Sequence, residues 1–494
     1  MLEGYRQDYT NFNRALMQEY YLYYSGQKTE FAIAPIYERY GDLFTSDSVA
    51  TLKRTFEATP EHFETERTAL RRLLIFATNQ YLDSAVKEMT EELSQYETET
   101  KIDWSGGPMT FQDSAIRIAT EGDRPTRSAI YDARAKVVEG SNALRAERLS
   151  RLHAAARDSG YPSYTALYEA LHGRDYSRFA GECEALLART ESVYAARLDE
   201  ALRRDLGIGI EEAERPDAMY FLHQSHYDSR FPAEGILRVY RETMEGLGIS
   251  VESQKNILID AEARPHKSPR AFCAPVCVPD EIRLVIRPFG GQSDYQTFLH
   301  EAGHAQHYGG ASAGLAPEFK YTGDAALSET YAFLLNYLPA DEVWLSRLLG
   351  FTDNRDFIRA VMLSKLMAVR RYAAKLIYEL RLHSGGDAGD AAAQYSALQT
   401  ASTKFKTGES DFLYDLDDAF YSADYLRAWA FEVALREYLK KRFGNQWWSN
   451  RRAGRFLQEI WETGDRYTAD EMASQIGIGP ISFDLLMDEF VQMQ

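Results

Sequence analysis

The sequence predicts a mainly α-helical fold that carries one small β-sheet. Of the 494 residues, 45% are hydrophobic and 13% are aromatic, which is enough for a large buried core. Apolar residues recur every three to four positions through most of the chain, among many glutamate, arginine, alanine and leucine residues, as in amphipathic helices. Strand-like sequence is concentrated in residues 271–287.

The expected helices are separated by glycine and proline, which interrupt helical hydrogen bonding. No repeat or low-complexity linker divides the chain. We expect an N-terminal helical lobe over 1–205 and a catalytic region over 206–494, with the two lobes interleaved in space. The helical pattern covers residues 6–25, 29–42, 46–57, 60–96, 126–158, 163–171, 175–204, 232–247, 294–308, 325–335, 341–383, 391–406, 424–443 and 452–463, with a loop at 385–390.

Two strand-like runs lie just before the helix expected at 294–308. Residues 271–278 and 282–287 are rich in valine, isoleucine and leucine, and a turn at 279–281 joins them. Cys273 and Cys277 belong to the first run, where we interpret them as small buried residues. A sheet here would present an edge strand to which an extended peptide could add.

The most informative motif of the chain is His300-Glu301-Ala302-Gly303-His304. Residues four apart share one face of an α-helix, so both imidazoles can reach a single metal ion. Glu301 then lies beside the ion, where it can hold a water molecule, an arrangement typical of hydrolytic zinc sites. Gly303 costs about 1 kcal/mol relative to alanine inside a helix, so we expect another backbone to pass close to it.

A catalytic zinc ion takes three protein ligands and leaves one position open, so a third ligand is needed. Glu329 is the better candidate, because it is a lone carboxylate in the apolar segment 325–335 and needs a partner to offset its desolvation. An ion pair with a core arginine would meet the same need. Asp324 is the alternative ligand. Asp294 and Ser328 are candidates to orient a ligand, although Asp294 also suits a helix cap.

Composition restricts the partners and the setting. The formal net charge of −18 argues against nucleic acid and anionic membrane surfaces. No run of apolar residues is long enough to span a membrane, and the N-terminus shows no secretory signal pattern. Three cysteines, Cys183 among them, do not make a disulfide framework, so we expect a reducing, cytoplasmic setting. No oligomeric state is indicated.

Residues 264–335 resemble the thimet oligopeptidase and oligoendopeptidase F group of zinc peptidases. The features of that group are the sequence His-Glu-x-Gly-His followed by His307, and a glutamate 29 residues after the first histidine. The segment from Arg264 to Cys273, which ends in Ala-Phe-Cys, is also similar to the substrate-side strand of that group. Angiotensin-converting-enzyme-like peptidases and Taq-type carboxypeptidases share this architecture and a similar motif spacing.

The resemblance implies a two-lobed helical metallopeptidase with a deep central channel, one zinc ion at its floor and the small sheet beside the zinc helix. Such channels admit short peptides and exclude folded proteins. The resemblance and the motif together predict hydrolysis of peptide bonds in short peptides, with Glu301 as the general base. Carboxypeptidase or dipeptidyl carboxypeptidase action is the alternative, and a peptide-binding protein without activity is a third reading.

The C-terminal part departs from the family pattern. Tyr421 and Tyr425 match two family tyrosines and, being four apart, can point into one cleft. The tyrosine usually credited with stabilising the oxyanion would fall near Ala428, and no histidine follows His383. Tyr421, Tyr425 or Arg427 could complete the site, and ordinary aromatic packing is the other reading of the two tyrosines.

Substrate contacts are the least constrained part of the prediction. The candidates are Arg270, Ala271, His307 and Arg427. His307 lies one turn after His304 and could support a ligand or face the substrate, because a fourth protein ligand would leave no position for water. His266 could also line the cleft, and we interpret His223 and His226 as structural or cleft residues.

Overall fold

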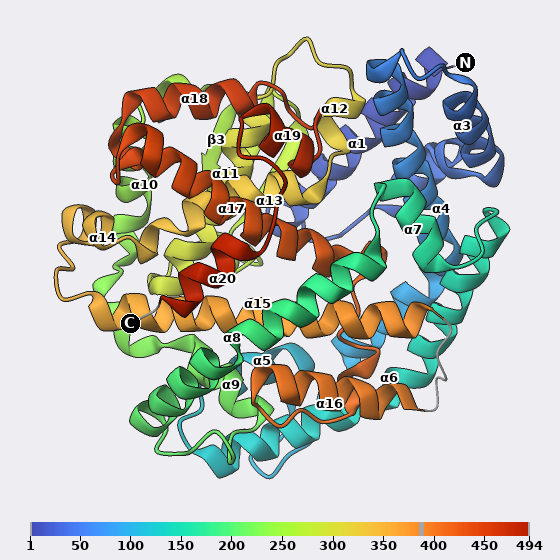
Figure 1. Ribbon diagram of the computed structural model, residues 1–494. Helices are drawn as coiled ribbons and strands as arrows, with labels where there is room; N and C mark the ends of the chain where they lie inside the picture. The colour runs from blue at the N-terminus through green and yellow to red at the C-terminus, as the bar shows by residue number, and fades with distance from the viewer. Residues whose placement is uncertain (1, 385–389, 493–494) are drawn as a thin grey trace. The chain divides into compact units, whose positions relative to one another are not determined.

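The computed structural model describes residues 2–384 and 390–492 and has the predicted mainly α-helical fold with a small sheet (Figure 1). Contacts divide the chain into two compact units, each assembled from separate segments. The first unit comprises the residues up to Ala77, Ser225–Ala360 and Arg427–Leu486, and the second comprises Thr78–Gln224, Val361–Leu426 and the residues from Met487 on.

The first unit holds most of the strands. Its elements are α1 (Leu2–Tyr24), α2 (Ala34–Arg39), α3 (Ser46–Ala58), α10 (Ile236–Gly246), β3 (Ile257–Asp260), β4 (Phe272–Cys277), β5 (Glu281–Val285), α11 (Gln292–Gly310), α12 (Glu318–Tyr321), α13 (Ala325–Asn336), α14 (Glu342–Leu349), α18 (Arg451–Trp461) and α19 (Ala469–Gln475).

The second unit is built mainly from long helices. Its elements are β1 (Lys101–Ile102), β2 (Met109–Thr110), α5 (Phe111–Thr120), α6 (Arg124–Asp158), α7 (Tyr164–His172), α8 (Tyr176–Asp205), α9 (Arg215–His223) and α16 (Ala391–Thr403). Four helices contribute residues to both units: α4 (Glu64–Glu99), α15 (Arg355–His383), α17 (Tyr421–Phe443) and α20 (Asp484–Val491).

The predicted domain boundary at 205/206 lies inside the second unit, directly after α8. Both units combine segments that are distant in sequence, because each core buries apolar faces of helices from several parts of the chain. The loop expected at 385–390 falls mostly outside the described residues.

Most predicted helices are present, with differences that have local causes. The helix expected over 341–383 is two helices, because Gly350 adopts a left-handed conformation (φ 65°) and caps the end of α14. The one expected over 29–42 is reduced to α2, in which Pro35 occupies the first turn and excludes an earlier start. α5, α9, α19 and α20 are short helices that the periodicity did not reveal.

The three-stranded sheet has the order β3-β5-β4. β4 and β5 are antiparallel, as the predicted hairpin requires, and β3 adds to β5 in parallel. β4 is therefore an edge strand, and one face of it packs on Tyr21 of α1. The proline within β4 fits an edge position, because proline lacks an N–H for a second ladder.

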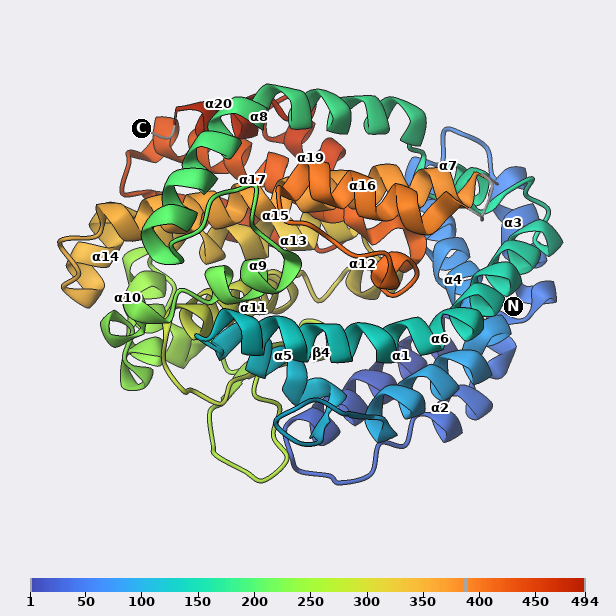
Figure 2. The same cartoon turned by 90° about the horizontal axis from the view of Figure 1, so that it is seen from below.

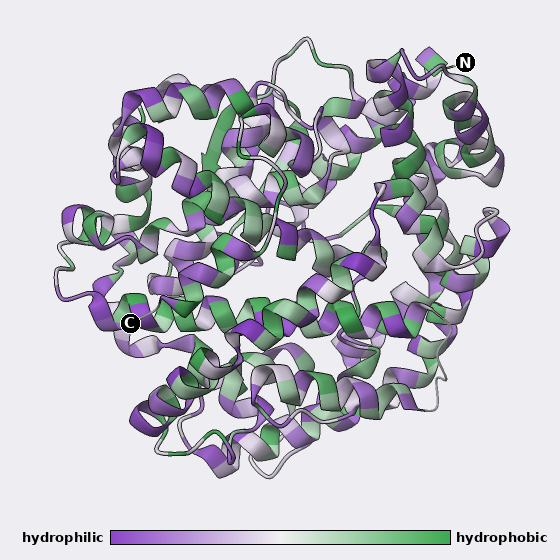
Figure 3. Ribbon diagram, in the orientation of Figure 1, coloured by the Kyte–Doolittle hydropathy of each residue, from purple (hydrophilic) through white to green (hydrophobic). Residues whose placement is uncertain are grey.

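Hydrophobic and hydrophilic residues alternate along helices such as α6 and α8, as Figure 3 shows. By contrast, every residue of α13 from 326 to 335 is buried. This helix is the centre of the first unit, and α11 packs along it. In the second unit α15 and α16 lie side by side in both views (Figures 1 and 2), with Tyr378 against Tyr395.

Among the helices of the described residues, none combines the length and the apolar character that crossing a membrane requires.

Candidate metal centre

Gly303 brings the two helices of the candidate metal centre into close contact. A Cβ atom at this position would lie 2.5 Å from both Ala332 Cα and Tyr331 O of α13. Only glycine allows this approach, which confirms the expectation of a neighbouring backbone. The close packing sets α11, which carries His300 and His304, against α13, which carries Glu329.

His300, His304 and Glu329 converge at one point between these helices. Their ligand atoms all lie within 4.8 Å of one another. His300 Nε2 lies 3.3 Å from Glu329 Oε2, and His304 Nε2 lies 3.7 Å from Glu329 Oε1. Glu329 is 5% exposed. Its buried carboxylate faces the imidazoles of both histidines.

The protonation of the two histidines differs because their surroundings differ. Burial lowers the pKa of His304 to about 4, and Glu329 opposes this only in part. Burial would also lower the pKa of His300, but its hydrogen bond to Glu329 and the negative charge there raise it instead. His304 is therefore neutral near pH 7, the form in which an imidazole binds a metal.

Glu301 lies beside this group on the side of the sheet. Its Oε2 accepts a hydrogen bond of 2.9 Å from the backbone N–H of Cys273 in β4. Burial raises the pKa of Glu301 to about 7, although His300 and the Cys273 N–H oppose the shift. Glu301 thus connects the histidine helix α11 to the edge strand β4. A general base that acts between a metal-bound water molecule and a peptide on that strand would need this position.

The residues fit a divalent metal ion of the zinc type. The donor set of two imidazole nitrogens and one carboxylate is that of many catalytic zinc sites. Two donor atoms at about 2.0–2.1 Å from a tetrahedral zinc ion lie roughly 3.3 Å from each other. The two histidine nitrogens lie 3.3 and 3.7 Å from the nearest Glu329 oxygens, close to that value. Among the described residues, this is the one group of three or more such side chains close enough to hold an ion.

Ser328 supports the ligands from behind. Its Oγ lies 2.8 Å from His304 Nδ1, the ring nitrogen that faces away from Glu329. Asp294 does not take that role, because its carboxylate accepts hydrogen bonds from the N–H groups of Phe289 and Gly290 before α11. Of the two candidates to orient a ligand, Ser328 is the one in contact with it.

Two predicted substrate residues are buried and paired within the protein. His307 is fully buried, and its Nδ1 lies 3.4 Å from Ser328 Oγ, so it faces the back of the ligands. Arg427 makes a bidentate pair with Asp324, at 2.9 Å for both bonds, and also contacts Asp470. Asp324 caps α13 through Ala326 N–H, so this pair anchors the helix that carries Glu329.

Arg270 and Ala271 lie where β4 begins. Arg270 is exposed, and its backbone N–H and carbonyl bond to the Ser268 hydroxyl. Ala271 is half-buried and directly precedes β4. Both positions remain predicted substrate contacts. His266, in the same loop, is exposed and has a left-handed backbone (φ 62°).

Tyr421 and Tyr425 form the first turn of α17, and both belong to the second unit. Their rings meet edge to face with centroids 5.0 Å apart, in contact as the i, i+4 spacing predicts. Their catalytic role stays a prediction.

A strained turn precedes these tyrosines. Ala419 and Phe420 both have positive φ angles, of 59° and 56°, which non-glycine residues rarely adopt. The buried carboxylate of Glu379 accepts hydrogen bonds from Asp417 N–H at 2.8 Å and from the Ser422 hydroxyl at 2.6 Å, on either side of the turn. These contacts hold the start of α17 in one conformation.

Tyr308 is a phenol near the metal ligands that the sequence reasoning did not single out. Its ring stacks with that of His304, with centroids 6.3 Å apart, and its hydroxyl lies 3.4 Å from Ser328 Oγ. Its spacing could have indicated Tyr308, because residues 300, 304 and 308 are four apart and share one helix face.

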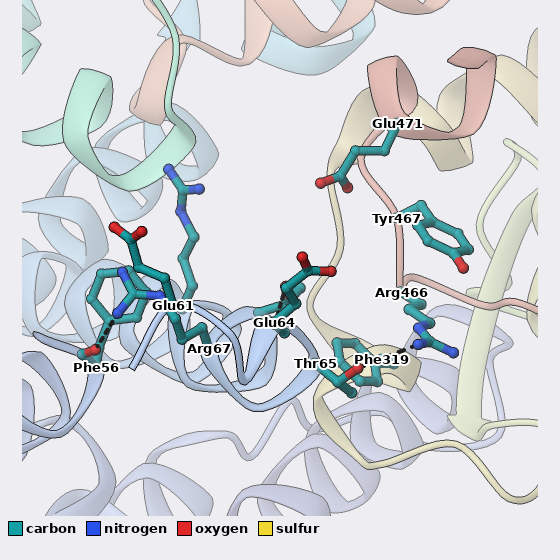
Figure 4. Close-up of a pocket in the computed structure, with 11 residues that line it drawn as sticks. Phe56, Glu61, Glu64, Thr65, Arg67, Phe319, Arg466, Tyr467 and Glu471 are labelled. Carbon is teal, nitrogen blue, oxygen red and sulfur yellow. Dashed lines mark hydrogen bonds between the residues drawn. The ribbon is translucent and has the colours of Figure 1, made fainter. Parts of the chain in front are cut away.

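A polar cavity of about 340 Å³ lies elsewhere in the first unit, and it contains none of the metal-binding residues (Figure 4). Three arginines and three glutamates line it, together with Phe319 and Tyr467. The charged residues are Glu61, Glu64, Arg67, Arg71, Arg466 and Glu471.

The chain is similar in structure to two solved peptidases. One is a putative oligoendopeptidase F from Bacillus anthracis str. Ames, with a TM-score of 0.65 and 14% identity over 96% of this chain and 86% of that one. The other is Trypanosoma cruzi metallocarboxypeptidase 1, with a TM-score of 0.65 and 13% identity over 99% of this chain and 98% of that one. At this identity the likeness shows the fold, a mainly α-helical metallopeptidase fold.

No protein-family model and no curated protein matches the sequence.

Proposed function

We propose that the protein is a zinc-dependent peptidase that cleaves peptide bonds in short peptides. The observation that carries the proposal is the convergence of His300, His304 and Glu329 beside Glu301 and an edge strand. A zinc ion bound there would acidify a water molecule and polarise a peptide carbonyl. The three side chains would hold the ion and leave a position open.

Glu301 acts as the general base in this proposal. It does not belong to the group of three ligands, yet it follows His300 directly and its carboxylate is turned toward β4. From there it can take a proton from a water molecule and return it to the leaving amine. A structural metal site has no need of such a base, which argues against a peptide-binding protein without activity.

The substrate lies along β4 in this proposal. β4 is an edge strand, so it can pair with an extended peptide through backbone hydrogen bonds. Cys273 N–H contacts Glu301, which places this part of the strand next to the base. A peptide paired there would bring a carbonyl close to Glu301 without requiring a particular side chain, as suits an oligopeptidase.

Phenol hydroxyls stabilise the oxyanion in this proposal. Tyr421 and Tyr425 are the predicted donors, and they are held on a rigid turn of α17. One well-placed donor of this kind contributes about 3–4 kcal/mol to lowering the barrier.

Carboxypeptidase action is the second candidate, because one of the two similar structures is a metallocarboxypeptidase. Such an enzyme needs a cation to bind the substrate's terminal carboxylate. Arg270, exposed at the start of β4, is the residue we propose for that role. An oligoendopeptidase would not depend on it.

A quenched fluorescent peptide library tests the proposal. We expect turnover that a chelator abolishes and that zinc restores. Mass spectrometry of the products separates internal cleavage from removal of C-terminal residues, and blocking the C-terminus as an amide should slow only a carboxypeptidase. Absence of any metal-dependent cleavage across the library would overturn the proposal.

A further inference from the structure

Five aromatic residues gather where the edge strand β4 begins. The last two turns of α1 carry Tyr20, Tyr23 and Tyr24. Phe31, in the segment after α1, contacts all three rings, with centroids between 4.8 and 5.9 Å from its own. Phe272, the first residue of β4, meets Tyr24 edge to face at 6.1 Å. This aromatic cluster lies entirely in the first unit and joins α1 to the edge strand.

Tyr24 is the member of the aromatic cluster that faces the solvent. It is 40% exposed, whereas the other four residues are half-buried. Tyr20 stacks on it from one turn earlier in α1, with centroids 5.8 Å apart and the ring planes at 14°. A tyrosine ring held in this way offers apolar area at a low cost in conformational entropy. Grouped apolar surface on a soluble protein is typical of binding sites.

The loop before β4 holds the backbone around Tyr24 in place. Ser268 N–H donates to Tyr24 O, and Arg264 Nε donates to Ser25 O, both at 2.8 Å. The loop is itself braced by Lys267, which is 2% exposed. The ammonium of this lysine donates to three oxygen atoms that precede it in the chain, at 2.8–2.9 Å. The ring of Tyr24 is therefore preorganised beside the start of the strand.

The two faces of β4 have different neighbours. Side chains alternate between the faces of a strand, and Phe272 and Ala274 pack on the side of α1. Cys273 points to the other face. Its backbone N–H is donated to Glu301 and not to β5, so this N–H marks the free edge of the strand beside the proposed base.

A peptide paired with this edge would follow the same alternation, because residues opposite each other in paired strands share one face. The peptide residue level with Cys273 lies beside Glu301 and points away from α1. The neighbouring residue, level with Phe272, points toward α1 and meets the rings of Phe272 and Tyr24. The aromatic cluster is therefore within reach of one substrate position, and the residue beside the base is not the one that contacts it.

We infer that Tyr24 and Phe272 form a specificity subsite for a bulky apolar side chain, that of the substrate residue next to the one beside Glu301. The inference rests on the peptidase function proposed above and adds the class of substrate. The occupant is apolar because the subsite consists of aromatic rings and no member of the aromatic cluster carries a charge. A phenylalanine there, in place of alanine, should raise kcat/KM about tenfold or more.

Quenched fluorescent peptides that differ only in the position of one phenylalanine in an alanine background test the inference. Mass spectrometry locates the cleaved bond in each. We expect kcat/KM to rise about tenfold or more when the phenylalanine is at one fixed distance from that bond, and not when it is one residue nearer or farther. Leucine at the same position should act like phenylalanine. Equal rates for all positions, or a preference for lysine there, would overturn the inference.

Tyr24→Ala removes the exposed ring of the subsite. Most of the preference for phenylalanine over alanine should be lost, while the all-alanine peptide is cleaved as by wild type. Tyr24→Phe keeps the ring and should keep the preference. If Tyr24→Ala does not fold, Tyr24→Gln retains more of the side-chain volume without the ring and should lose the preference in the same way.

Tyr438→Ala is the matched control. Tyr438 of α17 is a half-buried tyrosine of the first unit that also pairs with a phenylalanine, Phe456 of α18, at 5.4 Å. Its loss should lower the melting temperature and leave the ratio of kcat/KM between the two peptides unchanged, because a merely structural role affects both peptides alike.

The outcomes separate the inference from the proposed function. An unchanged preference in Tyr24→Ala would overturn the subsite and leave the peptidase function standing. A wild-type protein that cleaves none of these peptides, nor any in the library, would overturn the proposed function and the inference with it.

Discussion

The candidate metal ligands and the two candidate tyrosines are held in place by different kinds of interaction. In the first unit, two helices touch backbone to backbone at Gly303, and three candidate ligands lie within 4.8 Å of one another between them. In the second unit, a buried carboxylate and a left-handed turn fix the start of α17. Local helix geometry explains the first arrangement, whereas contacts between distant residues explain the second.

The two regions also differ in the side chains that surround them. Behind the ligands lie Ser328, which contacts His304, and His307, whose pKa is lowered by burial. Around the tyrosine turn the charges are immediate, since Lys375 lies 2.8 Å from Asp417 and Arg148 pairs with Asp418.

The largest effect is expected from Glu329→Gln, which removes a ligand of the metal centre. Zinc affinity should fall by more than the roughly 10–100-fold that loss of a supporting partner costs. Glu318→Gln is the control, because Glu318 is an equally buried glutamate of the first unit that pairs with Arg6. It should lower the melting temperature without weakening zinc binding, and equal zinc affinities for the two variants would contradict the assignment.

Removal of the tyrosine hydroxyls should affect turnover alone. Tyr421→Phe and Tyr425→Phe should each lower kcat, by about 100-fold where the hydroxyl is an oxyanion donor, with zinc affinity unchanged. Tyr194→Phe removes a buried hydroxyl of the same unit that donates to Thr403 O, and it should change only stability. If both α17 variants turn over peptide like wild type, these tyrosines only pack.

Gly303→Ala tests the contact between α11 and α13. The added Cβ would meet the Ala332 backbone at 2.5 Å, so the helices must separate, at a cost of about 1–3 kcal/mol in the free energy of unfolding. Zinc affinity should fall as well, because the separation moves Glu329 from the histidines. Gly181→Ala in α8 meets no atom within 4 Å and should be neutral or stabilise by up to about 1 kcal/mol.

The smallest effect is a change in the pH dependence of stability with Glu379→Gln. Burial raises the pKa of Glu379 to about 8, from 4.5 in an unperturbed carboxyl, although Lys375 opposes the shift. Between these values the folded state binds more protons than the unfolded state, so wild-type stability contains a contribution that falls as pH rises. The glutamine variant lacks this proton, and its stability should fall less between about pH 5 and 8. Denaturant unfolding at several pH values measures the difference, and identical slopes would contradict it.

The local arrangement of the candidate metal ligands could be predicted from the sequence. The spacing of His300 and His304 placed both on one face of α11, and the isolation of Glu329 in an apolar segment indicated a charged partner. Gly303 indicated a close backbone. Each inference used a few neighbouring residues and the geometry of one helix, which is why it could be made without the fold.

The remaining features depend on contacts between distant segments. Arg427 and His307 were among the candidate substrate contacts, with support of a ligand as the other reading for His307. Tertiary packing buries both against partners that helical periodicity could not identify. The same holds for β3, whose four residues form a strand only because β5 lies beside them.

The most direct test of the central claim combines metal content with turnover in Glu301→Gln. The account predicts that wild type and variant each bind one zinc ion with similar affinity, and that the variant hydrolyses peptides about 10²–10⁴-fold more slowly. Zinc-dependent hydrolysis at the wild-type rate in Glu301→Gln would contradict the account, because the base would then have to be another group.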